Sequence, residues 1–247
     1  MSRKTNKQTG KTRKRSVGRG IRNGCAALLA VLLCMAALLL RSCPASDAAQ
    51  AAMAEKRIDR QTTIFEAETP RAGLIFYPGA LVEHEAYAPL MKMLADRGIT
   101  CLLVQMPFDL AVLDVNAAQG IAQQVQGIDF WMIGGHSLGG AMAAAYAAEH
   151  PQDFDALVLL GAYSQADLSD TAINVLSVLG SNDGVLSREK YEQCLAQYPD
   201  SFQEFVIEGG CHAFFGDYGM QKGDGKPSIS RDMQMGMTAS AIASMIE

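Results

Sequence analysis

The sequence predicts an α/β domain, built as a doubly wound, mostly parallel sheet with helices on both faces and no sizeable cap domain. From about residue 62 onward, short apolar runs alternate with segments of helical periodicity. Residues 157–160, Leu-Val-Leu-Leu, are apolar at every position, which is typical of a strand covered on both faces. A chain of 247 residues with 49% hydrophobic residues is long enough for one such domain and an N-terminal appendage.

The expected elements follow one another in a regular order. Strands are predicted at residues 72–77, 100–105, 129–134, 155–160, 174–180 and 202–207. Helices are predicted at residues 86–97, 115–124, 139–150, 188–197 and 230–246. Ligands of such sheets bind beyond the carboxyl ends of the strands, so chemistry is expected in the loops that follow the apolar runs.

The N-terminal region differs from the rest of the chain in charge. Nine of the 21 Lys and Arg residues fall within the first 22 positions, and no Asp or Glu precedes Asp47. An uncharged apolar stretch at residues 24–40 follows, and this order is typical of a membrane-targeting element. We therefore expect a basic cytoplasmic n-region at 1–23, a transmembrane signal anchor or signal-peptide core at 24–40, a linker at 41–61 and the domain at 62–247.

Three outcomes of this targeting element stay open. An uncleaved anchor would give a single-pass protein of the cell membrane with its domain outside the cytoplasm, and the 17 apolar residues are at the lower limit for spanning. Cleavage near Asp47 would give a secreted protein. Residues 40–43 also resemble a bacterial lipobox that ends at Cys43, although Arg41 departs from that pattern.

Charge and cysteine spacing exclude some partners. From Pro44 onward the chain has 11 basic and 26 acidic residues, a net charge of −15 that would repel a phosphate backbone, so no nucleic acid partner is expected. Of the six cysteines, three fall in the domain, and their spacings match no zinc pattern. We expect no metal, at least one free thiol, and a buried, inert thiol at Cys211.

The motif Gly-x-Ser-x-Gly at residues 135–139 lies between an apolar run and an alanine-rich helical segment. This strand–turn–helix context is the one that a nucleophile elbow needs, because only glycines fit beside so tight a turn. Ser137 would lie exposed at the helix N-terminus, where the helix dipole favours developing negative charge. Ser137 is the candidate nucleophile.

A serine nucleophile needs a base, and histidine has a pKa suited to that role. His212 follows the last predicted strand in a glycine-flanked loop, which makes it the candidate base. The other three histidines are less well placed: His84 opens a helix, His150 closes one, and His136 is expected to point away from the site.

The base needs an acid that holds its tautomer, and in this order of elements the acid precedes the histidine. Asp183 comes just after the strand predicted at 174–180, whereas Asp217 follows His212. Asp183 is the candidate acid. Asp167, Asp170 and Asp200 are less suitable as the acid, because they lie ahead of predicted strands or between elements and not beyond a strand end.

An oxyanion would be held by two backbone N–H groups. One is expected from Leu138, directly after the nucleophile, and the other from the loop 77–82, where Gly79 allows close approach. Ala80 is the expected second donor, with Leu81 as the alternative.

Together, the elbow, Asp183, His212 and the tripeptide at 78–80 resemble the α/β-hydrolase family over residues 62–247. Residues 77–82 and 134–140 are similar to a small capless bacterial branch described as dienelactone-hydrolase-like, although a dienelactone hydrolase has a cysteine where this elbow has Ser137. The resemblance implies cleavage of an ester, thioester or amide bond in a small molecule through an acyl-enzyme, with no cofactor.

Two other functions remain compatible with this sequence. A cofactor-free acyltransferase or perhydrolase would use the same triad, and a binding protein of the same fold would be catalytically silent. The connection 161–173 is too short for a lid, which predicts an open pocket. Residues 214–219 and 221–224 are expected either to form one wall of it or to serve as a connector.

Overall fold

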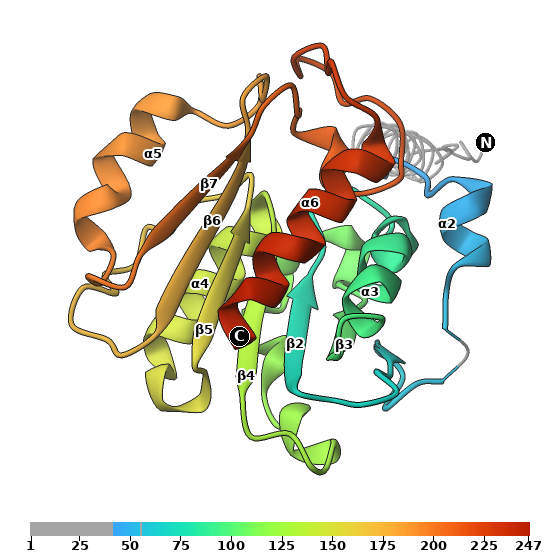
Figure 1. Cartoon of the computed structure of the whole chain (residues 1–247), viewed down its shortest axis with the longest axis vertical. Coiled ribbons are helices and arrows are strands. Elements are labelled where there is room, and N and C mark those ends of the chain that lie inside the picture. Colours follow the sequence, from blue (N-terminus) through green and yellow to red (C-terminus); the bar gives the residue numbers. More distant parts are fainter. Residues whose placement is uncertain (1–41, 55) are drawn as a thin grey trace, which may run out of the picture. The chain divides into compact units, whose positions relative to one another are not determined.

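The computed structural model describes residues 42–54 and 56–247, and its centre is one seven-stranded sheet (Figure 1). The strands are β1 (Thr62–Phe65), β2 (Ala72–Tyr77), β3 (Ile99–Val104), β4 (Trp131–His136), β5 (Ala156–Leu160), β6 (Asn174–Gly180) and β7 (Gln203–Ile207). Their order in the sheet is β1-β3-β2-β4-β5-β6-β7. Only β1 runs antiparallel to its neighbour, so the predicted mostly parallel sheet is confirmed.

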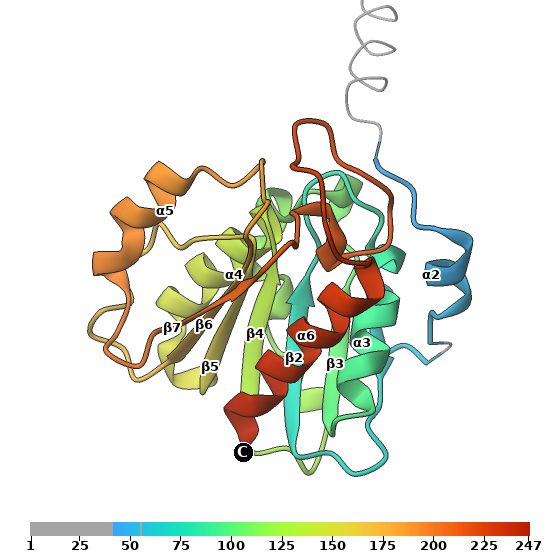
Figure 2. The same cartoon turned by 45° about the horizontal axis from the view of Figure 1, so that its top comes forward.

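Helices cover both faces of this sheet (Figures 1 and 2). The α-helices are α2 (Asp47–Ala51), α3 (Ala88–Ala95), α4 (Leu138–Glu149), α5 (Arg188–Cys194) and α6 (Arg231–Ala243). Short 3₁₀ turns are η1 (His84–Tyr87), η2 (Pro107–Asp109), η3 (Ala111–Leu113), η4 (Val115–Ala118), η5 (Ala122–Gln124), η6 (Pro151–Asp153), η7 (Leu195–Gln197), η8 (Ala213–Phe215) and η9 (Ser244–Ile246). No helix lies in the connection from β5 to β6, so the fold has no sizeable cap between these strands.

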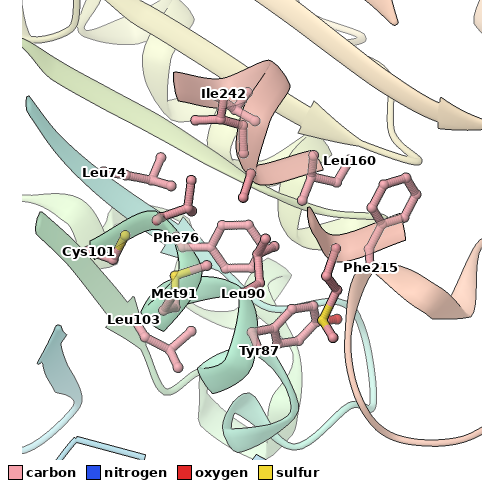
Figure 3. Packing of buried hydrophobic residues seen from close by; sticks show 14 of the residues in the cluster. Leu74, Phe76, Tyr87, Leu90, Met91, Cys101, Leu103, Leu160, Phe215 and Ile242 are labelled. Atoms are coloured by element: carbon pink, nitrogen blue, oxygen red, sulfur yellow. The ribbon is translucent and has the colours of Figure 1, made fainter. Parts of the chain in front are cut away.

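Apolar side chains on both faces of the central strands produce two cores, one on each face of the sheet. In β2, Leu74 and Phe76 pack with α3 and α6, while Ile75 and Tyr77 pack on the side of α4. Figure 3 shows the first of these clusters, in which Leu74 and Phe76 lie among side chains from the covering helices. Successive side chains of a strand point to opposite faces, and burial of each contributes about 1.5–3 kcal/mol, so both faces need a helical cover.

The six predicted strands are confirmed, with their ends displaced by at most two residues. Strand β1 was not predicted, because its four residues, Thr-Thr-Ile-Phe, are too few to give a clear pattern. The helix predicted at 115–124 is wrong. The segment forms the turns η4 and η5 instead, since Gly120 between them has a φ of +74°, which an α-helix cannot contain.

Part of the predicted linker at 41–61 is built into the domain. The Cys43 N–H donates to the Leu81 carbonyl at 2.7 Å, and the Ser46 N–H donates to the Asp217 carbonyl at 2.9 Å. The Ser46 hydroxyl accepts from the Ala49 N–H and so caps α2, and the Ala49 side chain is fully buried. Residues 42–51 are therefore packed against the domain by hydrogen bonds and by a buried methyl group.

The prediction of a transmembrane helix needs correction. In the part of the chain that the structure describes, no helix is both long and apolar enough to cross a membrane. The segment expected to span, residues 24–40, lies outside the described residues, as does the basic region at 1–23. The part of the chain from residue 42 onward that the structure describes thus contains no spanning helix.

The packing of α2 gives a first prediction. Replacing Ala49 by Asp puts a carboxylate into a buried position, and we expect a loss of about 2–4 kcal/mol in the free energy of unfolding, measured by urea denaturation. Limited proteolysis should then cleave within residues 42–54. The matched control is Ala48→Asp, because Ala48 is exposed on the same helix. Equal stability of the two variants would mean that this segment is a linker after all.

Candidate active site

Ser137 lies in a strained turn between β4 and α4. Its φ is 52° and its ψ is −124°, a backbone conformation that residues other than glycine rarely adopt. A Cβ on Gly139 would lie 2.2 Å from the Pro78 carbonyl oxygen, and one on Gly135 would lie 2.5 Å from that of Tyr77. Only glycines fit at these two positions, and they let the turn pack directly on the backbone that follows β2.

His212 and Asp183 form a buried pair on neighbouring loops. His212 follows β7, Asp183 follows β6, and His212 Nδ1 lies 2.8 Å from Asp183 Oδ2. The exposed fractions of the two side chains are 1% and 0%, so this contact is shielded from water. The other carboxylate oxygen, Oδ1, accepts from the N–H groups of Val185 and Leu186, each at 2.8 Å.

These contacts decide the charge of the acid. Burial by itself would raise the pKa of Asp183, but the hydrogen bond and charge of His212 act against it, together with the N–H groups of Leu186 and Val185. The net result is a pKa below the ordinary value of an aspartate. The carboxylate is therefore ionised at neutral pH and can hold the proton of His212 on Nδ1.

Glycine also makes room for this pair. Gly161 directly follows β5 and has a φ of +51°, and a Cβ there would lie 3.0 Å from His212 Nδ1 and 3.2 Å from Asp183 Oδ2. On the opposite side of the imidazole, His212 Nε2 has no hydrogen-bond partner among the described residues. A side chain at position 161 would thus crowd the pair on the Nδ1 side of the ring.

The two backbone N–H groups that the sequence predicts as oxyanion donors are unused in the same way. Within residues 42–54 and 56–247, the N–H groups of Ala80 and Leu138 donate to no protein acceptor. The N–H of Leu81 donates to the Asp109 carbonyl at 2.8 Å. Because the Leu81 N–H already donates this hydrogen bond, only Ala80, of the two predicted donors in loop 77–82, has an N–H without an acceptor.

His136 does not point away from the site, and this expectation was wrong. Its ring centroid lies 4.5 Å from that of His212, and its Nδ1 lies 2.8 Å from the Tyr87 hydroxyl. The Tyr87 oxygen also accepts from the Gly79 N–H at 3.0 Å. These bonds join the loop after β2 to the elbow. Sequence reasoning missed Tyr87, because a tyrosine in a helical segment gives no signal of a buried hydroxyl.

The other candidates have no part in the His212–Asp183 pair. Asp217 bonds to Ser46 and Arg231 and not to a histidine. His84 is paired with Glu85 at 3.0 Å, and burial lowers the pKa of His84. Burial and the nearby Asp224 carboxylate raise the pKa of Cys211 to about 12, so this buried thiol stays protonated at neutral pH. No disulfide occurs among the cysteines that the structure describes.

A pocket of about 460 Å³ opens beside the elbow. Its walls come from α4 and from the loops after β5, β6 and β7, and they include Ser137, Leu138, Met142, Tyr163, Leu186 and His212. No Asp, Glu, Lys or Arg is among its described lining residues. Residues 214–219 and 221–224 do not line it, so the wall expected from them is not formed.

A larger groove of about 660 Å³ lies along the amino-terminal halves of β6 and β7 and along α6, away from Ser137.

Comparison with known proteins identifies the family to which this fold belongs. The model of the alpha/beta hydrolase family matches residues 73–236, which is more than half of the chain. The chain belongs to the alpha/beta hydrolase family. No curated protein matches the sequence of this hydrolase. The narrower dienelactone-hydrolase-like resemblance is not confirmed by these comparisons and stays a prediction.

Solved structures agree with this family through their fold. Est1E from Butyrivibrio proteoclasticus has a TM-score of 0.56 at 14% identity, covering 75% of this chain and 93% of Est1E. TT1662 from Thermus thermophilus has a TM-score of 0.55 at 16% identity, covering 75% and 93%. An alpha-beta serine hydrolase homologue from Coxiella burnetii has a TM-score of 0.53 at 15% identity, covering 75% and 91%. At these identities the likeness concerns the fold of the hydrolase alone.

The burial of His136 predicts a pH dependence of stability. Burial, and then the neighbouring His212, hold the pKa of His136 well below its ordinary value, so the folded protein keeps this ring neutral. On acidification below about pH 6.5 the unfolded chain takes up a proton that the folded chain does not, and stability falls by up to about 1.4 kcal/mol per pH unit.

This dependence is measured by urea denaturation between pH 5 and pH 8. In His136→Gln the slope below pH 6.5 should be smaller by about one proton. At pH 8 the ring is neutral in both states, so the difference between the two proteins there reports only the altered packing. Identical slopes in variant and wild type would show that His136 titrates normally.

Proposed function

We propose that this chain is a serine hydrolase that cleaves a small-molecule ester, or a related thioester or amide, through an acyl-enzyme. Ser137 is the nucleophile, His212 the general base and acid, and Asp183 the group that fixes the imidazole. The N–H groups of Ala80 and Leu138 bind the oxyanion. Membership of the alpha/beta hydrolase family supports a hydrolase, and the triad and substrate class are the finer part of the proposal.

One observation carries this proposal. The buried His212–Asp183 pair, joined at 2.8 Å, leaves Nε2 without a partner, and His212 and Ser137 line the same pocket. Asp183 can keep a proton on Nδ1, which leaves Nε2 as the basic nitrogen of the ring. A carbonyl carbon bound beside Ser137 would then have a nucleophile, a base and two oxyanion donors around it.

The proposed reaction proceeds in two acyl-transfer steps. Ser137 Oγ attacks the carbonyl carbon while its proton passes to His212 Nε2, and the carbonyl oxygen becomes an oxyanion held by two N–H groups. The imidazolium then gives this proton to the departing alkoxide, so the leaving group exits as an alcohol. Water attacks the acyl-enzyme in the same manner, giving its proton to Nε2, and the acid leaves as Ser137 regains its hydroxyl.

The lining of the pocket supports an uncharged substrate. A volume of about 460 Å³ is within the range of small-ligand sites, and the described lining has no charged side chain that would pair with a substrate anion or cation. Met142, Leu186 and Tyr163 offer apolar contact to an acyl or aryl group. A charged group bound here would lose its hydration without gaining a partner.

Labelling of the nucleophile tests the proposal. Wild-type protein should react with a fluorophosphonate probe at Ser137 and should release a burst of nitrophenol from a nitrophenyl ester before the steady state. Ser137→Ala should abolish both, with a change in the free energy of unfolding below about 1 kcal/mol, because it removes only the hydroxyl of a half-buried side chain and keeps the packing of the elbow backbone. Folded wild-type protein that reacts with none of several phosphonates would favour the catalytically silent binding protein.

The acid is tested by a pair of matched variants. Asp183→Asn should retain the fold and lower kcat by roughly 10⁴-fold, because the amide no longer holds the productive tautomer of His212. Asp217→Asn should keep kcat within about twofold, since Asp217 contacts Ser46 and Arg231 instead of a histidine. The assignment is wrong if Asp183→Asn is active and Asp217→Asn is not.

The products formed with an added alcohol acceptor distinguish hydrolysis from acyl transfer.

A further inference from the structure

The loop of residues 221–226 contacts both loops that bear the candidate base and acid. Its central residue, Asp224, accepts four backbone hydrogen bonds. Oδ1 accepts from the N–H groups of Gly225 at 2.8 Å, His212 at 3.1 Å and Gly184 at 3.2 Å, and Oδ2 accepts from that of Ala213 at 2.8 Å. A single carboxylate thus binds the backbone of His212 itself and of the residue after Asp183.

Such bonds are stronger than those between neutral groups. A carboxylate that accepts from backbone N–H groups forms charge-assisted hydrogen bonds, which are shorter and roughly twice as strong as neutral ones. The three loop positions that donate, at 184, 212 and 213, come from two separate segments of the chain. Asp224 therefore acts as a bridge between the acid loop and the base loop.

The packing around this bridge is close enough to fix its position. A Cβ on Gly225 would lie 1.8 Å from the Asn182 carbonyl oxygen, and one on Gly184 would lie 2.6 Å from that of Gly223. The Asn182 side-chain amide donates to the Lys226 carbonyl at 3.0 Å. The two backbones touch with no side chain between them, so loop 221–226 is held against the acid loop.

We propose that Asp224 is a positioning residue of the hydrolase, one that sets the distance between Asp183 and His212. This inference rests on the proposed function. The 2.8 Å contact between His212 Nδ1 and Asp183 Oδ2 joins loops that are 29 residues apart, and their relative position must be held to a fraction of an ångström for the proton to stay on Nδ1. Asp224 touches neither the pocket nor the reacting atoms, and it acts through the two backbones.

The test compares Asp224→Ala and Asp224→Asn with wild type. Alanine removes all four bonds, whereas asparagine keeps one acceptor oxygen, so kcat should fall in the order wild type, Asn, Ala. We expect a loss of about 10- to 100-fold in kcat for Asp224→Ala, with KM changed by less than about threefold. The rate of fluorophosphonate labelling should fall in parallel, and Asp224→Asn serves as the variant more certain to fold.

Asp59→Ala is the matched control. Asp59 also accepts from two backbone N–H groups, those of Gln61 at 2.8 Å and Thr62 at 2.7 Å, but it does so at the start of β1 on the other edge of the sheet. This variant should lose stability and keep kcat, measured well below its unfolding temperature. If Asp224→Ala behaves like Asp59→Ala, with kcat per labelled Ser137 unchanged, its role is merely structural and the proposal fails.

A readout without activity separates this proposal from the proposed function. The proton between His212 Nδ1 and the Asp183 carboxylate should give a downfield proton resonance in wild-type protein. Asp224→Ala should shift or broaden it beyond detection, while Asp59→Ala should keep it. A wild-type protein that shows the resonance but hydrolyses no ester would contradict the proposed hydrolase function, but it would not contradict the positioning role of Asp224. An unchanged resonance in Asp224→Ala would refute the bridge, whatever the activity.

Discussion

The strained backbone at Ser137 is the constraint on which the site depends. A φ of 52° for a serine costs free energy, and the strained turn persists because the packing of the surrounding chain holds it in this conformation. Gly135 and Gly139 pack on the carbonyl groups of Tyr77 and Pro78 with no room for a methyl group. This contact also places the loop after β2, which contains Ala80, against the elbow.

Buried polar groups form a second layer around this turn. A carboxylate as deeply buried as Asp183 would be costly alone, but it has His212 on one oxygen and two backbone N–H groups on the other. The buried Tyr87 hydroxyl is satisfied by the Gly79 N–H and by His136 Nδ1, whereas His136 Nε2 has no partner among the described residues. Such networks favour one arrangement of the loops over many, because any shift leaves a buried group without its partner.

Several features that concern the fold were accessible from the sequence because they depend on local pattern. Apolar runs identified six strands, and the elbow motif was recognisable because sterics demand glycine on both sides of Ser137. The errors have equally local causes. Gly120 breaks the helix expected at 115–124, β1 is too short to show periodicity, and residues 42–51 look like a linker although Ala49 is buried. An alanine-rich segment gives no sign of whether its methyl groups face solvent or a neighbour.

By itself, therefore, the sequence determined a doubly wound α/β sheet, and it supplied Ser137, Asp183 and His212, in this chain order, as the residues of the proposed triad. Only the tertiary structure decided which further groups surround them. It committed the Leu81 N–H to Asp109, turned the His136 ring toward His212 instead of away from it, and brought Asp224 onto two separate loops. These contacts join residues distant along the chain, and they depend on side-chain directions and loop approach that no repeat or motif encodes.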